Sequence, residues 1–347
     1  MWRPEALTRA SFSRVLKGRT LRLIGDSLMS HHYQYLTRCV LGCTYEEMRV
    51  NTISPAADEK HWNISLGAAG FSTDARFWAL KSLRLASGKE WFAKGCRLEG
   101  GGRIDFRRVN FLPQNVARPG GGTYRELLAA LLHTLVYWPG YKQGLPLSGD
   151  DVVMLNFGLH EGADLPQKMS DLLRWWAAEG TRAPRLLWRQ GSPQHWPASP
   201  LGAFRDLSDV IETKSRPCLA QDVDVEKAQE LYDANVSKLV REAGRQGRGG
   251  GGGGIASGGG GSSSSGSHSG TSSARQRWAN VLDVFTATWQ RDDDHANLVE
   301  GSLAIKNLAR TFGLNASYSL PDCTHYCIPG SVLRFWTQAL LVSLHEE

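Results

Sequence analysis

Two short segments at opposite ends of the sequence carry side chains that could together catalyse acyl transfer. Gly25-Asp26-Ser27 directly follows an apolar run at residues 21–24, and Asp322-Cys323-Thr324-His325 lies close to the C-terminus. A serine hydroxyl can attack an acyl group, a neutral imidazole can take its proton near pH 7, and a carboxylate can orient that imidazole. The two segments therefore predict a Ser-His-Asp centre made of Ser27, His325 and Asp322.

The position of Ser27 favours a catalytic role because it lies where a strand gives way to a helix. The run 21–24 is short and apolar, and the apolar residues from Met29 to Val40 recur at helical spacing. Gly25 permits a tight turn, and the unpaired N–H groups at the start of the helix could stabilise an oxyanion on the substrate. The alternative is that Ser27 only caps the helix, as serine often does.

A second Asp-x-x-His, formed by Asp292 and His295, competes for the roles of acid and base. Asp322 and His325 are favoured because a Pro-Gly turn and then an amphipathic pattern follow them, which places them directly before a helix on the core. Their spacing lets both side chains point the same way from a turn or a helix entrance. His295 ends an acidic run, for which we expect a solvated surface.

Six blocks, in order over nearly the whole chain, share a pattern with a known family. They are Trp2-Arg3-Pro4 and residues 16–28, 151–160, 188–195, 291–295 and 322–330. The last block, Asp322-Cys323-Thr324-His325-Tyr326-Cys327-Ile328-Pro329-Gly330, is close to the Asp-Cys-Ser-His-Trp-Cys-Leu-Pro-Gly of that family. The chain thus resembles the plant trichome birefringence-like domain, a branch of the SGNH-hydrolase and PC-esterase superfamily.

This resemblance implies a three-layer α/β fold with a mainly parallel sheet flanked by helices, in one catalytic domain over residues 1–347. It also implies a polysaccharide O-acetyltransferase that works through an acetyl-serine intermediate. The partners would be a glycan acceptor and an acetyl donor as co-substrate, without a bound cofactor. Ser27 matches the nucleophile of the family, and Asp322 and His325 match its acid and base.

Further candidates lie at the ends of predicted strands, where doubly wound sheets bind ligands. The candidates for oxyanion or substrate binding are Gly25, Asp26, Asn156, Gly158, His160, Arg189 and His195. A zinc site is not favoured, because no His-x-His or His-x-x-x-His pair accompanies the histidines. The chain departs from the family at Met29-Ser30-His31-His32, where Ser-Arg-Asn-Gln is usual, and this leaves the identities of donor and acceptor open.

The elements that must position these residues alternate along the chain. Predicted strands cover residues 21–25, 152–157, 185–189 and 281–286, and predicted helices cover 124–137, 167–179 and 224–243. Such alternation indicates a mainly parallel sheet with helices on both faces. Residues 98–122 are predicted to form a loop, and the Gly/Ser-rich residues 244–274 a disordered insert without a catalytic role.

Composition excludes some classes of partner. With 41% apolar residues among 347, the chain can bury one substantial core. The net charge of +6 is mildly basic, but the Lys and Arg residues are scattered and no basic stripe with interleaved aromatics occurs. Nucleic acid is therefore not predicted as a partner, whereas an acidic glycan would suit the surface.

The cysteines and the N-glycosylation sequons are the residues that indicate the cellular compartment of the protein. Together with the resemblance, the six cysteines predict disulfides, and bridges from Cys323 or Cys327 would hold His325 in place. N-x-Ser sequons at Asn63, Asn235 and Asn315 are compatible with a glycoprotein of the secretory pathway, and the resemblance implies the Golgi. Neither a signal peptide nor a membrane span is visible, so a membrane anchor would belong to a longer gene product.

Two rival functions use the same segments. A carbohydrate acetyl esterase would need the same three residues, with water in place of the glycan hydroxyl. The choice depends on whether the closed site excludes water, which the sequence does not decide. A glycan-binding module with a lapsed site is the third alternative, and retention of Ser27, Asp322 and His325 argues against it.

Overall fold

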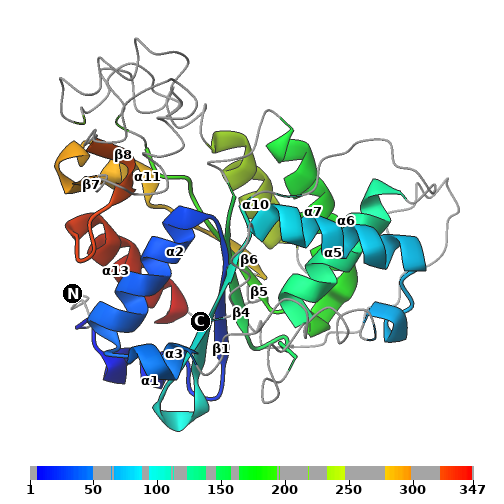
Figure 1. The fold of residues 1–347 in the computed structure, drawn as a ribbon, viewed down its shortest axis with the longest axis horizontal. Coiled ribbons are helices and arrows are strands. Elements are labelled where there is room, and N and C mark those ends of the chain that lie inside the picture. Colours follow the sequence, from blue (N-terminus) through cyan, green and yellow to red (C-terminus); the bar gives the residue numbers. More distant parts are fainter. Residues whose placement is uncertain are drawn as a thin grey trace, which may run out of the picture.

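The protein folds around a six-stranded sheet that has helices on both faces (Figure 1). The computed structural model describes residues 6–49, 64, 66–87, 94–110, 112, 123–137, 146–157, 164–193, 195, 218, 233–246, 278–297 and 321–345. The architecture is α/β with a mostly parallel sheet, as predicted, and it is compatible with three layers.

The sheet has the strand order β2-β3-β1-β4-β5-β6. The five parallel strands are β3 (Arg103–Arg108), β1 (Thr20–Gly25), β4 (Val152–Asn156), β5 (Arg185–Arg189) and β6 (Ala279–Leu282). The edge strand β2 (Lys94–Arg97) runs antiparallel to β3. Because β1 lies between β3 and β4, its C-terminal residue Gly25 is a register partner of Asn156.

The helices form two layers, one on each face of the sheet (Figure 1). One layer contains α1 (Arg9–Val15), α2 (Ser27–Gln34) and α13 (Ser331–His345). The other contains α6 (Tyr124–Tyr137), α7 (Leu165–Glu179) and α10 (Ala234–Gln246), with α5 (Thr73–Ser87) packed against α6.

Shorter elements extend this framework. A π-helical segment, Tyr35–Val40, continues α2, and the short helices are α3 (Tyr45–Arg49) and α11 (Phe285–Thr288). Single 3-10 turns lie at Glu99–Gly101, Gly180–Arg182 and Asp292–Asp294. A separate antiparallel pair, β7 (His295–Asn297) and β8 (Pro321–Tyr326), lies near α2 and α13 at the upper left of Figure 1.

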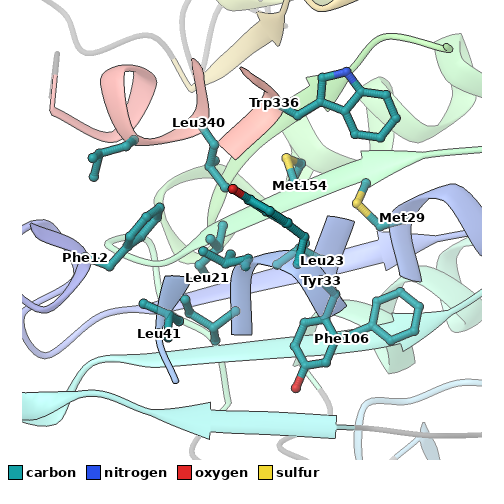
Figure 2. Close-up of a cluster of buried hydrophobic side chains, with 14 of the residues drawn as sticks. Phe12, Leu21, Leu23, Met29, Tyr33, Leu41, Phe106, Met154, Trp336 and Leu340 are labelled. Carbon is teal, nitrogen blue, oxygen red and sulfur yellow. The ribbon is translucent and has the colours of Figure 1, made fainter. Parts of the chain in front are cut away.

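Alternation along β1 supplies both hydrophobic layers. Leu21 and Leu23 join the core beneath α2 and α13, which Figure 2 shows together with Phe12, Met29, Tyr33 and Trp336. Ile24 joins the core under α6 and α7. Arg22 is also buried, and its Nη1 donates to the main-chain oxygens of Leu135 and Val136 at the end of α6, where a helix favours a cation.

The prediction that residues 98–122 form a loop is wrong for β3. Asp105 on this strand is buried and forms an ion pair with Arg22 of β1, with 3.1 Å between Arg22 Nη2 and Asp105 Oδ2, and Arg103 also bonds its carboxylate. A buried charge tolerates such a site only when it is paired. The strand was not predicted because Asp105 interrupts its apolar pattern, and its buried partner Arg22 lies on β1, far away in the sequence.

Two predicted boundaries also change. The strand predicted at 281–286 is β6, which ends at Leu282, and α11 begins at Phe285. Helix α10 continues to Gln246, so the first residues of the predicted disordered insert are helical, while 247–274 lie outside the described residues. A Cβ on Gly244 would lie 2.1 Å from the oxygen of Ala279, so glycine lets α10 pack closely on β6.

Asp233, directly before α10, gives the fold a testable pH dependence. Trp188 Nε1 donates to both of its carboxylate oxygens at 2.8 and 3.0 Å, and Ser237 Oγ donates at 2.7 Å. Burial nevertheless raises the pKa of Asp233 to about 7. The folded protein therefore binds this proton more tightly than the unfolded chain, so the contribution to stability is complete below about pH 4 and is lost as the pH rises through about 7.

We expect the free energy of unfolding to fall between about pH 5 and about pH 8, by at least about 1 kcal/mol more in the wild type than in Asp233→Asn. Urea unfolding at the two pH values measures this difference. Asp283→Asn is the matched control, because Asp283 is exposed and pairs with Arg241 at 3.4 Å. Equal pH slopes for the wild type and Asp233→Asn would contradict the prediction.

Candidate active site

The turn from β1 into α2 frees the Ser27 hydroxyl from a capping role. Asp26 is the N-cap of α2, and its Oδ1 accepts from the backbone N–H groups of Leu28 and Met29 at 2.9 and 3.4 Å. Ser27 is the first helical residue, so the alternative that it serves only as the N-cap is wrong.

Gly25 fits this turn because nothing larger would. A Cβ added there would lie 2.3 Å from the main-chain oxygen of Asn156 and 2.9 Å from Met29 Cβ. The chain can therefore pass from β1 into α2 beside the end of β4 only with glycine at this position. This close approach places Ser27 at the C-terminal edge of the sheet, where the sequence predicted the site.

The structure brings Ser27 and His325 together across 298 residues of sequence. Ser27 Oγ lies 2.7 Å from His325 Nε2. With a hydrogen on Nδ1, the neutral ring accepts the serine O–H at Nε2 and can act as a general base. This predicted contact is thus present in the geometry that proton transfer needs.

His325 lies in a bulged strand, whereas a turn or a helix entrance was expected. In the pairing of β7 with β8, His295 is opposite Tyr326, yet the next residue, Ala296, is opposite Asp322. The residues between Asp322 and Tyr326 therefore bulge from the ladder, and such bulges redirect side chains. The side chain of Asp322 lies outside the described residues, so its role as the third member of the triad stays a prediction.

His31 is a neighbour of Ser27 and His325 that sequence reasoning noted only as a departure from the pattern of the family that the chain resembles. It lies four residues after Ser27 on α2, and its ring centroid is 4.8 Å from that of His325. Its Nδ1 lies 3.3 Å from the main-chain oxygen of Tyr326. The four-residue spacing, which puts two side chains on one helix face, was the signal that could have identified it.

Asn156 and Arg189 are buried beside the site. The Asn156 amide donates to the main-chain oxygens of Arg189 and Gln190 at 2.9 and 3.2 Å, so both of its hydrogens are used to join the ends of β4 and β5. The Arg189 guanidinium is fully buried, 4.2 Å from the Trp336 ring, and among the described residues its nitrogens have no hydrogen-bond partner.

The complete burial of Arg189 favours a role in holding neighbouring residues in place over direct contact with a substrate. Burial lowers the pKa of its guanidinium to about 10, and the nearby carboxylate of Asp26 opposes that shift. The oxyanion and substrate roles of Asn156 and Arg189 stay predictions. Two other candidates, Gly158 and His160, lie outside the described residues.

The expectation that His295 lies on a solvated surface is wrong. His295 is half-buried in β7, and its ring stacks on Tyr326 with 4.4 Å between centroids. The preceding Asp294 accepts from Val332 N through Oδ2 at 2.7 Å and from Cys327 N through its main-chain oxygen at 2.8 Å. The acidic run thus caps α13 and holds the segment that follows His325.

His195 lies in contact with His295. Its side chain is fully buried, its Nδ1 is 2.6 Å from His295 Nε2, and its Nε2 is 2.7 Å from the main-chain oxygen of Trp289. The His295 Nδ1 in turn lies 3.1 Å from the main-chain oxygen of His325. The structure therefore connects His195, a predicted site residue, to His325 through the ring of His295. Sequence reasoning missed this connection.

The cysteines confirm that the chain forms disulfides and exclude Cys327 as the source of the expected bridge beside His325. Cys43 and Cys96 form a disulfide, and Cys218 is also disulfide-bonded. Cys327, however, is a free thiol that donates to the main-chain oxygen of His295 at 3.3 Å, so it does not form the expected bridge beside His325. The side chain of Cys323 lies outside the described residues.

Several negative findings complete the description of the site. Within the ranges that the structure describes, no helix is long and apolar enough to cross a membrane. Over the same ranges, no group of three or more His, Cys, Asp or Glu side chains could hold a metal ion. No family model and no curated protein matches this chain.

Proposed function

We propose that the protein is an O-acetyltransferase of the SGNH-hydrolase and PC-esterase type, which acetylates a hydroxyl of a polysaccharide or glycan through an acetyl-serine intermediate. The observation that carries the proposal is the 2.7 Å contact between Ser27 Oγ and His325 Nε2 at the start of α2. The glycan substrate is proposed from the resemblance of the sequence blocks around both residues.

The geometry supports a two-step reaction. His325 Nε2 takes the proton of Ser27 as Oγ attacks the carbonyl carbon of the acetyl donor, and the protonated ring then gives that proton to the leaving group. The N-terminus of α2 presents its positive end to the oxyanion that forms. In the second step His325 takes a proton from the glycan hydroxyl, whose oxygen attacks the acetyl carbon. The bond from that carbon to Ser27 Oγ then breaks, and the protonated ring returns the proton to Oγ.

The Cys43–Cys96 disulfide supports the secretory pathway as the compartment of this reaction, and the Golgi is proposed from the sequence resemblance alone. Disulfides persist in oxidising compartments and are rare in the cytosol. The bridge joins the segment after α2 to the edge strand β2, so it ties the helix of the nucleophile to the sheet.

A serine-reactive fluorophosphonate tests the proposal directly. We expect one covalent adduct, located at Ser27 by peptide mass spectrometry, because only a serine activated by a base reacts readily. Ser30→Ala should keep the adduct, since Ser30 Oγ accepts from Gln34 on the same helix and does not contact His325. An unmodified protein, or an adduct elsewhere, would refute the assignment of the nucleophile.

A product assay on the same protein distinguishes a transferase from an esterase. With an acetyl donor and an oligosaccharide present, a transferase yields acetylated sugar faster than free acetate, because the acceptor displaces water from the site. Release of acetate alone, at a rate independent of the oligosaccharide, would show that the protein is a carbohydrate acetyl esterase and not a transferase.

A further inference from the structure

Two histidines connect the body of the protein to the strand that carries His325. His195 Nε2 lies 2.7 Å from the main-chain oxygen of Trp289, and His195 Nδ1 lies 2.6 Å from His295 Nε2. His295 Nδ1 lies 3.1 Å from the main-chain oxygen of His325. All four ring nitrogens of the pair are therefore within hydrogen-bond distance of a partner. A carbonyl oxygen lies at each end.

A count of hydrogens fixes the charge of this arrangement. Carbonyl oxygens only accept, so His195 Nε2 and His295 Nδ1 must each carry a hydrogen. The contact between the two rings requires one more hydrogen, on either nitrogen. Two neutral imidazoles carry two hydrogens in total, whereas the three bonds need three, so the fully bonded pair carries one positive charge.

We propose that His195 and His295 are a singly protonated pair of positioning residues that holds the main chain of His325 in place for catalysis. The inference rests on the proposed function, in which His325 is the base. It gives His195 a role through His295 and not through contact with the sugar. The pair acts at the bulge of β8, where the register of the ladder with β7 shifts.

The surroundings place the extra proton on His295. Burial lowers the pKa of the His195 imidazole, although the carbonyl of Trp289 and the carboxylates of Asp292 and Asp293 oppose that shift. His195 is fully buried, while His295 is half-buried and directly follows three aspartates. His195 is then the neutral tautomer with its hydrogen on Nε2, and His295 donates from both nitrogens.

The other groups that face the pair leave this assignment unchanged. Asp293 is bonded to Arg291, and Asp294 accepts from the first turn of α13. Among the described side chains, the other polar and titratable neighbours are Tyr326, which donates to the oxygen of Pro193, the Cys327 thiol, and the rings of His325 and His31. Within this set, the acidic run supplies the negative charge near the pair.

The count predicts how the pair responds to pH. As the pH rises the pair loses its third hydrogen and can keep only two of its three bonds. As the pH falls it gains a fourth, and the two rings then present hydrogens to each other. Either change breaks the continuous chain of hydrogen bonds that anchors the main chain of His325 to Trp289, so the pair sets limits on activity in addition to the requirement that His325 be neutral.

Nitrogen NMR of the whole protein, labelled with ¹⁵N in the histidine rings, tests the charge without any substrate. At neutral pH we expect one ring protonated on both nitrogens and one neutral ring, assigned by the signals that disappear in His295→Asn and His195→Gln. Titration from about pH 5 to about pH 9 should change the two rings together. Two neutral rings at neutral pH would overturn the proposal, whether or not the protein transfers acetyl groups.

Kinetics of the variants test the positioning role. In His295→Asn the amide can still donate to the His325 oxygen but no longer reaches His195, and we expect kcat to fall about 100-fold with KM nearly unchanged. The pH profile should also lose the fall in activity that titration of the His195–His295 pair causes. His133→Asn, a substitution of a half-buried histidine on α6 across the sheet, is the matched control and should leave kcat and the pH profile as in the wild type.

The two proposals fail in different ways. Absence of a phosphonate adduct at Ser27 would refute the acyl-transfer function, while the ring titration would still report the pair. An adduct at Ser27 together with a wild-type kcat and pH profile in His295→Asn would refute the positioning role alone.

Discussion

Replacing Ser27 by alanine is expected to lower acyl transfer by about four to six orders of magnitude while the protein stays folded. The variant removes the hydroxyl that contacts His325 and leaves Asp26 in place as the cap of α2. What remains is the contribution of binding and of the helix terminus to the oxyanion. Steady-state rates with an acetyl donor, compared with thermal unfolding of the same samples, measure both effects.

Ser30→Ala is the control for this experiment, because it deletes a hydroxyl from the same helix and leaves the side chains of Ser27 and His325 unchanged. It should retain activity close to that of the wild type. A folded Ser27→Ala protein with near-normal turnover would remove Ser27 from the mechanism, whatever the sequence blocks imply.

The parallel strands could be predicted because burial leaves a local trace in the sequence. In β4 and β5 every residue is buried, so that Val152–Asn156 and Arg185–Arg189 appear as short runs of mostly apolar residues between helical patterns. In β3 the buried residues include Asp105, whose carboxylate pairs with Arg22 on another strand. A partner so distant in sequence leaves no local pattern.

The same distinction separates the parts of the site. Gly25 and Ser27 could be predicted because a strand, a turn and a helix start within a few residues of each other, and each requires a particular residue type there. His295 could not, because its neighbours His195 and His325 are 100 and 30 residues away. Its acidic flank suggested solvent, but Asp294 in fact binds the first turn of α13.

His325→Ala is expected to lower acyl transfer as severely as Ser27→Ala, and the double variant should be scarcely worse than either single one. The two side chains share one hydrogen bond and one proton transfer, so removing either abolishes the same step. Independent contributions would instead multiply the two losses. Rate measurements on the two single variants and the double variant, at equal protein concentration and pH, decide between these outcomes.

His295→Ala distinguishes the base from the residue that positions it. Its ring nitrogens lie within hydrogen-bond distance of the main chain of His325 and the ring of His195, so this variant should still form the phosphonate adduct at Ser27, at a reduced rate. Its loss should therefore lie well short of that in His325→Ala, and combining it with Ser27→Ala should add nothing further. The reverse order of severity would make Asp292 and His295 the acid and base, and would contradict the sequence match at the block that contains His325.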